Sequence, residues 1–200
     1  MQTPRRKGSA VTDRASHKRL WMTVGLGFAL DVASKYLAWS YLGGPYQEGG
    51  RQVWLIQDFL CLVASKNPGI VFGFSFSDSF GIGVSAGRAI TILMTLATSA
   101  LIFYVFAMAR ARQKWMHLWC GLVLAGAFGN LYDRLLFGYV RDLIQMTAHM
   151  QFSRWTLNWP YIFNLADVYL VVGVVAVALE YIFGSKMDAE AESEPSPEED

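Results

Sequence analysis

Four long apolar stretches constrain the fold of this chain more than any other feature of its sequence. They run over residues 20–42, 89–109, 115–137 and 161–183. A helix rises about 1.5 Å per residue, so each stretch is long enough to cross the roughly 30 Å hydrocarbon core of a bilayer. The sequence therefore predicts an all-α membrane protein with four transmembrane helices.

The composition agrees with this class. Hydrophobic residues make up 54% of the 200 residues and charged residues only 16%. The formal net charge of +1 gives no indication of nucleic-acid binding. The first apolar stretch is too long for a cleaved signal peptide and no small-x-small cleavage site precedes Tyr41, so we expect it to remain as a membrane anchor.

The distribution of Lys and Arg predicts which side of the membrane each segment faces. Residues 1–19 carry six of them and the short connection 110–114 carries three, whereas the longer connections 43–87 and 138–160 carry two each. Positive residues are retained on the cytoplasmic side. We therefore expect both termini in the cytoplasm, and residues 43–88 and 138–160 to be exported.

The segments outside the helices differ in character. Residues 43–88 mix β-branched and aromatic residues with Gly and Pro, which predicts a small extracytoplasmic β-sheet lying on the membrane surface. The chain after residue 186 carries seven acidic residues and two prolines. Such a composition predicts a disordered cytoplasmic tail over residues 184–200.

Polar side chains within these apolar stretches call for an explanation, because a charged residue at membrane depth costs at least about 2.5–3.5 kcal/mol on insertion scales. Asp31 and Lys35 are four residues apart, so they share a helix face and can pair. Asn130 and Arg134 have the same spacing. For these residues and Asp133, stabilisation between helices and direct participation in chemistry are both open interpretations.

Other residues predict packing rather than chemistry. Gly121, Ala125 and Gly129 form a row of small residues that lets a neighbouring backbone approach closely. Cys61 and Cys120 fall at different depths, so we interpret them as free thiols and not as a disulfide. The three histidines lack any metal-ligand spacing.

Asp142 and Asp167 differ from the other acids. Asp142 lies just past the third helix and Asp167 about two turns into the fourth, so both are expected at the extracytoplasmic face, with the adjacent Arg141 pointing elsewhere. Two carboxylates held together in a poorly solvated site share one proton. Such a pair activates a water as base and donates to a carbonyl oxygen as acid. Two unrelated membrane-surface acids are the alternative.

Three other function classes stay open. A small proton-coupled transporter would use intramembrane Asp and Arg, although four helices without an internal repeat offer little for alternating access. A metal-dependent lipid head-group transferase would need a further Asp where Met146 stands. A non-catalytic membrane scaffold or assembly factor would tolerate Asn at positions 142 and 167, because an amide keeps the volume of the acid.

Several short motifs resemble those of one bacterial family. The first helix contains DVASK, the exported connection contains NPG and FGF, and the later motifs are GNLYDRLLFGYVRDLI and FNLADVYLVVG. In this order and in these contexts they resemble the bacterial lipoprotein signal peptidases, also called signal peptidase II, over about residues 25–175.

The resemblance implies an intramembrane aspartyl endopeptidase of the bacterial cytoplasmic (inner) membrane, with its active site at the extracytoplasmic face. Such an enzyme removes the signal peptide from diacylglyceryl-modified prolipoproteins by cutting just before the lipidated cysteine. Such an enzyme attacks the peptide bond with a water and forms no acyl-enzyme. The resemblance implies no metal or organic cofactor. Its partners are prolipoprotein substrates and membrane lipids, without nucleic acid, and a monomer is expected.

The motifs also carry over the family's functional positions. Asp142 in GYVRD and Asp167 in FNLAD match the catalytic pair. The residues that match the supporting and substrate-contacting positions are Asp31, Lys35, Asn67, Gly69, Asn130, Asp133, Arg134, Asn164 and Ala166. All of them fall in residues 20–183, the expected peptidase domain.

The chain departs from the family pattern in two places. Pro68, Ile70 and Val71 stand where the family has Thr and small residues, which stiffens this loop and adds bulk. The stretch 143–166 is also longer than is typical. Within it, the aromatic residues Trp155, Trp159 and Tyr161 suit anchoring at the membrane interface, and a lid over the substrate is the alternative.

Overall fold

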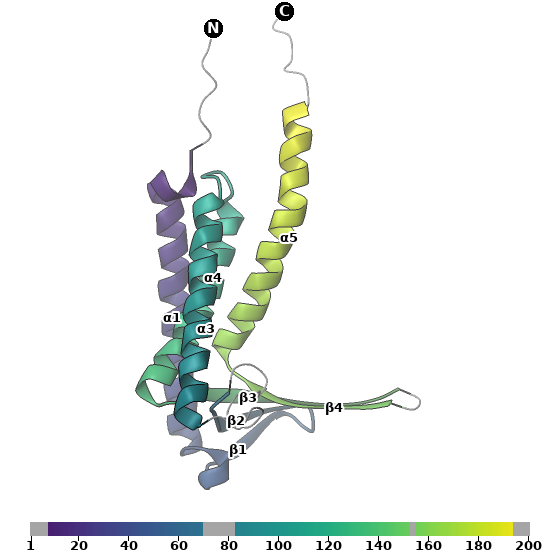
Figure 1. The fold of residues 1–200 in the computed structure, drawn as a ribbon. Coiled ribbons are helices and arrows are strands. Elements are labelled where there is room, and N and C mark those ends of the chain that lie inside the picture. Colours follow the sequence, from purple (N-terminus) through teal and green to yellow (C-terminus); the bar gives the residue numbers. More distant parts are fainter. Residues whose placement is uncertain (1–7, 70–82, 153–154, 194–200) are drawn as a thin grey trace, which may run out of the picture.

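The computed structural model describes residues 8–69, 83–152 and 155–193, which form long helices with a small sheet at one end of them (Figure 1). The long helices in these residues are α1 (Arg14–Leu42), α3 (Val84–Met108), α4 (Lys114–Leu136) and α5 (Leu165–Ser193). Two short 3-10 turns are η1 (Ala10–Thr12) and η2 (Tyr46–Glu48). The strands are β1 (Gln52–Ile56), β2 (Leu60–Asn67), β3 (Val140–Phe152) and β4 (Trp155–Phe163).

The sheet is antiparallel throughout, in the order β1-β2-β3-β4. A sheet was predicted within residues 43–88, but these residues form only its strands β1 and β2. The second exported piece, for which no strands were predicted, folds into the hairpin of β3 and β4, and this hairpin reaches beyond the helices (Figure 1). The sheet is therefore built from two segments separated by α3 and α4.

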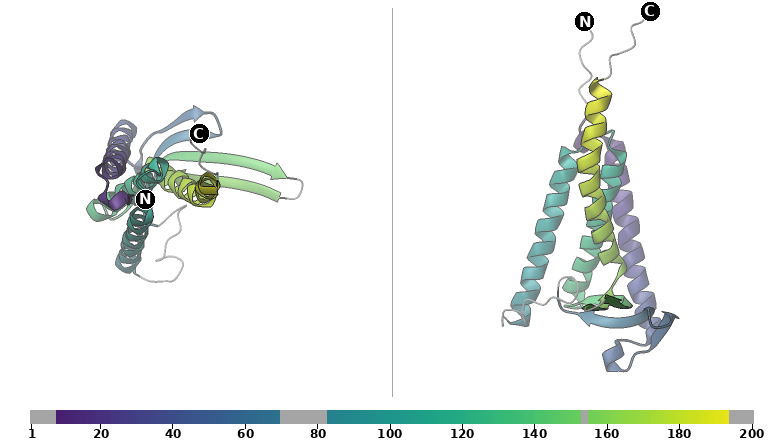
Figure 2. Two further views of the ribbon diagram at one scale, coloured as in Figure 1. Left: turned by 90° about the horizontal axis from the view of Figure 1, so that it is seen from above. Right: turned by 90° about the vertical axis from the view of Figure 1, so that its right-hand side faces the viewer.

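Helix α4 lies at the centre of the bundle and packs against α1, α3 and α5 (Figure 2). Small residues allow the close approach of α1. A Cβ added to Gly121 would lie 2.8 Å from the Cβ of Thr23, and one added to Gly27 would lie 2.8 Å from the Cβ of Ala125. The predicted role of the Gly121–Ala125–Gly129 row in helix packing is thereby confirmed.

The buried charged side chains and the buried apolar core lie at different ends of the bundle. The start of α1 and the end of α5 lie at one end, and the sheet lies at the other (Figure 1). The buried apolar core includes Ala10, Ile102, Phe106, Ala109 and Met116, which belong to the end remote from the sheet. Both cysteines are free and buried, as predicted.

The predicted bounds hold to within one residue at both ends of α4 and at the C-terminal ends of α1 and α3, but the N-terminal bounds of α1 and α3 are wrong. Helix α1 begins at Arg14 and not at residue 20, because the Asp13 carboxylate caps it by accepting a hydrogen bond of 2.8 Å from the Ser16 backbone N–H. Helix α3 begins at Val84 and not at residue 89. An apolar run marks only the apolar part of a helix, so polar or mixed end turns are missed.

Both ends of the last predicted helix, 161–183, are also wrong. Tyr161 and Phe163 belong to β4, where they pair with Met146 and Ile144 of β3, and the helix begins only at Leu165. Its other end continues to Ser193, so residues 184–193 of the predicted disordered tail are helical. Ala, Glu, Lys and Met have high helix propensity, and extending a formed helix costs less than nucleating one. Residues 194–200 lie outside the described part of the chain.

Two helices in the described residues are long and apolar enough to cross a membrane by length and composition, over Val84–Met108 and Leu165–Phe183. Helices α1 and α4 have lower mean hydropathy because they carry buried polar side chains. Asp31 and Lys35 lie in α1, and Asn130, Asp133 and Arg134 lie in α4.

The close contact of α1 and α4 generates a stability prediction. Gly121→Ala is expected to destabilise the protein by about 1–3 kcal/mol, because the new Cβ would meet Thr23 and the Leu20 carbonyl oxygen. Gly25→Ala in α1 is the matched control, since no atom lies within 4 Å of its added Cβ. The control should be neutral or stabilising by up to about 1 kcal/mol. Thermal unfolding in detergent measures both, and equal melting temperatures for the two variants would contradict this packing.

Candidate active site

Asp142 reaches the site from the sheet. It is the third residue of β3 and lies opposite Ser65 of β2. Its buried carboxylate accepts hydrogen bonds on both oxygens, at 2.8 Å from Nδ2 of Asn67 and at 2.7 Å from Nδ2 of Asn164. Strand pairing and two amide donors therefore fix the position of this acid.

Asp167 reaches the site from a helix start. Asn164 caps α5, because its Oδ1 accepts from the Asp167 backbone N–H at 3.1 Å while Oδ2 of Asp167 accepts from the Asn164 backbone N–H at 3.2 Å. The prediction that Asp167 lies two turns into the helix is wrong, since it lies in the first turn. This reciprocal cap holds the Asp167 carboxylate beside Asn164.

Two asparagine amides connect the acids. Nδ2 of Asn164 donates both to Asp142 and to Oδ1 of Asn130, the latter at 3.2 Å. Nδ2 of Asn130 then donates to Oδ1 of Asp167 at 2.8 Å. Helix capping alone would explain an acid at position 167, but it does not explain this second donor or the connection to Asp142.

The pKa of the Asp142 carboxyl is shifted toward neutral pH. Burial raises the pKa of its carboxyl and the nearby Asp167 carboxylate raises it further, to about 7. The hydrogen bonds from Asn67 and Asn164 act in the opposite direction, because amide donors favour the ionised acid. At pH 7 Asp142 is therefore poised between its two forms, as expected for a pair of acids that shares one proton.

A buried ammonium group orients one of the connecting amides. Nζ of Lys35 donates to Asp31 at 2.7 Å and to Oδ1 of Asn130 at 3.2 Å, and lies 3.3 Å from Oδ2 of Asp133. An ammonium group can only donate. The oxygen of the Asn130 amide must therefore face Lys35, which turns its NH2 group toward Asp167.

Asp31 ties the first helix to the start of the last one. Its Oδ1 accepts a hydrogen bond of 3.0 Å from the Ala166 backbone N–H, while Lys35 binds its other oxygen. Gly129 of α4 lies against the same carboxylate, and an added Cβ at this position would overlap it. The small residue at position 129 therefore keeps space for the acid.

Arg141 is the functional candidate that sequence reasoning missed. Its guanidinium donates to Oδ1 of Asp133 from Nη2 at 2.8 Å and from Nε at 3.1 Å, and its backbone N–H donates to the other oxygen at 2.9 Å. The rings of Tyr36 and Phe137 lie 4.2 and 4.4 Å from its Cζ. Arg141 points away from Asp142, as predicted, but a spacing of eight residues across a turn gave no signal of the pair with Asp133.

The loop after β2 is attached to the site at two points. The Gly69 backbone N–H donates to Oδ1 of Asn67 at 2.8 Å, which leaves the amide NH2 of Asn67 for Asp142. Nη2 of Arg134 donates to the Gly69 carbonyl oxygen at 2.8 Å. Pro68 lies exposed between the two anchored residues. Ile70 and Val71 lie outside the described residues.

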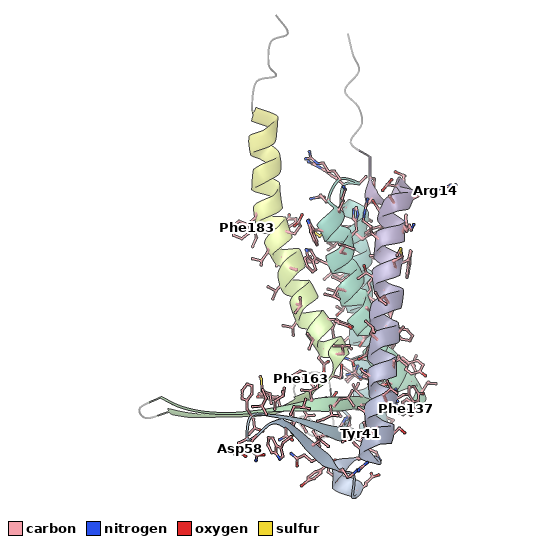
Figure 3. The ribbon with its side chains drawn as sticks, turned by 180° about the vertical axis from the view of Figure 1, so that it is seen from behind. Arg14, Tyr41, Asp58, Phe137, Phe163 and Phe183 are labelled. Carbon is pink, nitrogen blue, oxygen red and sulfur yellow. The ribbon has the colours of Figure 1, made fainter. Side chains whose placement is uncertain are left out.

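All of the predicted site residues belong to one hydrogen-bonded network at the sheet end of the bundle, since each is bonded or ion-paired to another member. Phe163, labelled at the base of the hairpin in Figure 3, marks the point where β4 leads into Asn164 and α5. Within the described residues, no three His, Cys, Asp or Glu side chains gather as a metal site would require.

A separate hollow of about 550 Å³ lies between α1, α4 and α5. Its walls are mostly apolar and include Met22, Leu26, Leu30, Leu118 and Leu122. None of the acids of the site lines it. An apolar occupant would suit this hollow, but the polar network lies elsewhere.

Comparison with known proteins gives consistent relatives. A family model for signal peptidase (SPase) II matches residues 23–183. The lipoprotein signal peptidase of Pseudomonas paraeruginosa is 37% identical over 172 residues, which cover 86% of this chain and 91% of the relative. The lipoprotein signal peptidase of Rhodococcus jostii is 31% identical over 191 residues, covering 90% and 82%.

Two solved structures, each described as a bacterial membrane enzyme, share the fold. The match to one of them, at 1.9 Å resolution, has a TM-score of 0.62 and 24% sequence identity, and it covers 81% of this chain and 91% of the chain in that structure. The match to the other, at 2.3 Å resolution, has a TM-score of 0.60 and 22% sequence identity, and it covers 88% of this chain and 93% of the chain in that structure. The family match spans both acids and the whole network around them, and the chain belongs to the signal peptidase (SPase) II family.

Proposed function

We propose that this chain is an intramembrane aspartyl endopeptidase that removes the signal peptide of diacylglyceryl-modified prolipoproteins, cutting just before the lipidated cysteine. The observation that carries the proposal is the connection of Asp142 and Asp167 through Asn164 and Asn130. The pKa of Asp142, raised to about 7, supports a shared proton. Family membership and the relatives named lipoprotein signal peptidase supply the substrate class.

In the proposed mechanism the two acids divide acid and base work. The ionised carboxylate takes a proton from a water, which attacks the scissile carbonyl carbon, while the protonated partner donates to the carbonyl oxygen. The resulting tetrahedral species collapses when the carboxyl that took the water proton passes it to the nitrogen of the leaving peptide. The other carboxylate then takes back the proton from the former carbonyl oxygen, which restores the pair with its single proton. No acyl-enzyme forms, and the reaction as proposed involves no metal or organic cofactor.

The proposed enzyme sits in the bacterial cytoplasmic membrane with both termini inside and its acids at the extracytoplasmic face. All four long helices would span the bilayer. Large apolar side chains on their outer surfaces, such as Leu37, Leu93 and Val175, are exposed and need a lipid environment. Lys and Arg gather near the end remote from the sheet. One chain carries the complete network, which supports a monomer.

Substitution of either acid is the direct test. Asp142→Asn and Asp167→Asn are each expected to lower the rate of prolipoprotein cleavage by about 10²–10⁴-fold or more, because an amide cannot carry the shared proton. Cleavage of a diacylglyceryl-modified prolipoprotein by the purified protein in micelles is followed by gel shift, with chelator present.

The control for these variants is Asp58→Asn, in the exposed turn between β1 and β2, which should cleave like the unchanged protein. Thermal unfolding confirms that the site variants are folded. Persistent cleavage in a folded Asp142 or Asp167 variant would remove that residue from catalysis. Loss of cleavage on adding chelator would contradict the metal-free mechanism.

The raised pKa of Asp142 generates a pH prediction. Above pH 7 the pair loses its shared proton, so no acid remains to donate to the carbonyl oxygen. The single-turnover cleavage rate is therefore expected to fall about tenfold per pH unit on the alkaline side, with a midpoint near 7. A rate that stays constant from about pH 6 to pH 9 would contradict this assignment.

The Arg141–Asp133 pair generates a prediction about both stability and cleavage. Arg141→Gln removes one of the two cations that pair with the buried Asp133 carboxylate and leaves Lys35 as the other, so it should destabilise the protein by at most about 3–5 kcal/mol. Cleavage should fall as well, because Asp133 also contacts Lys35. Lys66→Gln is the matched control, since Lys66 lies directly opposite Arg141 in the sheet but forms an exposed pair with Glu48. Similar melting temperatures for the two variants would show that the buried pair does not stabilise the site.

A further inference from the structure

The hollow between α1, α4 and α5 lies apart from the proposed catalytic acids and is not filled by protein. Helix α5 diverges from α1 and α4 toward the end remote from the sheet (Figures 1 and 3). In the described part of α5, Tyr169 is the one residue that lines the hollow, and a Cβ added to Gly27 of α1 would lie 3.5 Å from its Cε2. The space therefore opens where α5 leaves α1, and its volume is about 550 Å³.

The length of the hollow matches one leaflet of a bilayer. Along α1 its lining runs from Arg19 to Leu30, on residues three or four apart that share a helix face. This separation is a rise of about 16 Å, at about 1.5 Å per residue. Half of the roughly 30 Å hydrocarbon core is about 15 Å. An acyl chain of a lipid in one leaflet therefore has the length to lie along the hollow.

The walls of the hollow suit a hydrocarbon chain. Leu26 and Leu30 of α1 are exposed, and Leu118 and Leu122 of α4 are half-buried. A chain that fills the hollow gains van der Waals contact with all four leucines, whereas an empty space would forfeit these contacts. Because α5 leaves the hollow open along one side, a lipid tail can enter it from the surrounding bilayer.

Arg19 lies in the second turn of α1, at the end of the hollow remote from the sheet. Its Nη1 atom is buried and has no hydrogen-bond partner in the described residues. Asp13 is the one acid in residues 8–30, and its Oδ2 already accepts from the backbone N–H and the hydroxyl of Ser16, at 2.8 and 2.6 Å. A buried N–H group without an acceptor is costly, so the missing acceptor is expected to come from a bound ligand.

The charge around Arg19 selects the kind of ligand. Residues 8–19 and 110–118 carry six Lys or Arg side chains and one acid. A guanidinium group binds two phosphate oxygens at once, so a lipid phosphodiester supplies the acceptor. The signal peptide of a substrate is also apolar, but it carries basic residues at its cytoplasmic end, which Arg19 and its neighbours would repel. An anionic phospholipid therefore fits both the leucine walls and Arg19.

We propose that the hollow binds one anionic phospholipid of the cytoplasmic leaflet. One acyl chain lies between α1, α4 and α5, and the phosphodiester accepts hydrogen bonds from Arg19. The bound lipid fills the space left by the divergence of α5 and so supports the helix whose first turn carries Asp167. The inference rests on the membrane placement proposed above, but not on the peptidase activity.

Native mass spectrometry of the full-length protein, released from detergent micelles, tests the headgroup contact. The protein is titrated with phosphatidylglycerol and, separately, with phosphatidylethanolamine of the same acyl chains. One phosphatidylglycerol is expected to bind, several-fold more tightly than phosphatidylethanolamine, whose ammonium group cancels its charge. Arg19→Gln should weaken phosphatidylglycerol binding about tenfold or more, because a hydrogen bond to a charged group is lost. Lys18→Gln is the matched control, since Lys18 is exposed and does not line the hollow.

A second pair of variants tests the acyl chain. Leu26→Trp places a large ring in the hollow and should also weaken phosphatidylglycerol binding about tenfold or more. Leu37→Trp is its control, because Leu37 is exposed on the same helix outside the hollow. Both leucines are exposed, so neither change is expected to unfold the protein. Thermal unfolding gives an independent readout, since bound phosphatidylglycerol should raise the melting temperature of the controls more than that of Arg19→Gln or Leu26→Trp.

Three results would overturn the lipid site. These are equal phosphatidylglycerol binding by Arg19→Gln and Lys18→Gln, equal binding by Leu26→Trp and Leu37→Trp, and equal binding of the two lipids by the unchanged protein. Release of the bound lipid by an excess of intact prolipoprotein would assign the hollow to the signal peptide of the substrate, and would also overturn the proposal. The cleavage assay is separate, so an inactive protein that binds the lipid as described would contradict the peptidase alone.

Discussion

The buried ammonium group of Lys35 is the interaction on which the polar end of the bundle depends. Burying an ion without partners costs several kcal/mol, yet Lys35 is fully buried. Its three donors are matched by Asp31, Asp133 and the oxygen of Asn130. These partners lie on α1 and α4, and Asp31 in turn binds the backbone at the start of α5. One cation therefore sets the relative positions of three helices.

The same arrangement balances charge without water. Arg141 provides the second cation for Asp133, so two carboxylates and two cations form a neutral group beside the proposed catalytic pair. Arg134 adds a further positive charge near Asp142 and Asp167. When the proposed catalytic pair holds one proton it carries one negative charge, and this charge balances the positive charge of Arg134. This balance gives a physical reason for the pair to keep a single proton, apart from the mutual repulsion of its carboxylates.

The sequence predicted the helical class, the sheet in the first exported piece and every member of the polar network except Arg141. Charged residues in apolar stretches are conspicuous, and the family motifs assign a role to each position. It failed where local signals compete. Tyr161 to Phe163 read equally well as helix or strand, and only pairing with β3 decides for strand. The pairing of Arg141 with Asp133 depends on the turn after α4, which no periodicity predicts. The tail to Ser193 is helical because extending a formed helix costs less than nucleating one.

The boundary between helix and sheet explains why the two acids come from different kinds of structure. A pair placed wholly within helices at mid-membrane depth would lack water, which the proposed hydrolysis consumes. A pair placed wholly on the sheet would lose the burial that raises the pKa of Asp142. Asp142 lies near the start of β3, an interior strand of the sheet, and Asp167 lies in the first turn of α5, so Asn164 can bind both at the junction. Because the cap of α5 is also the amide that bonds to Asp142, any shift in where this helix begins would separate the two acids.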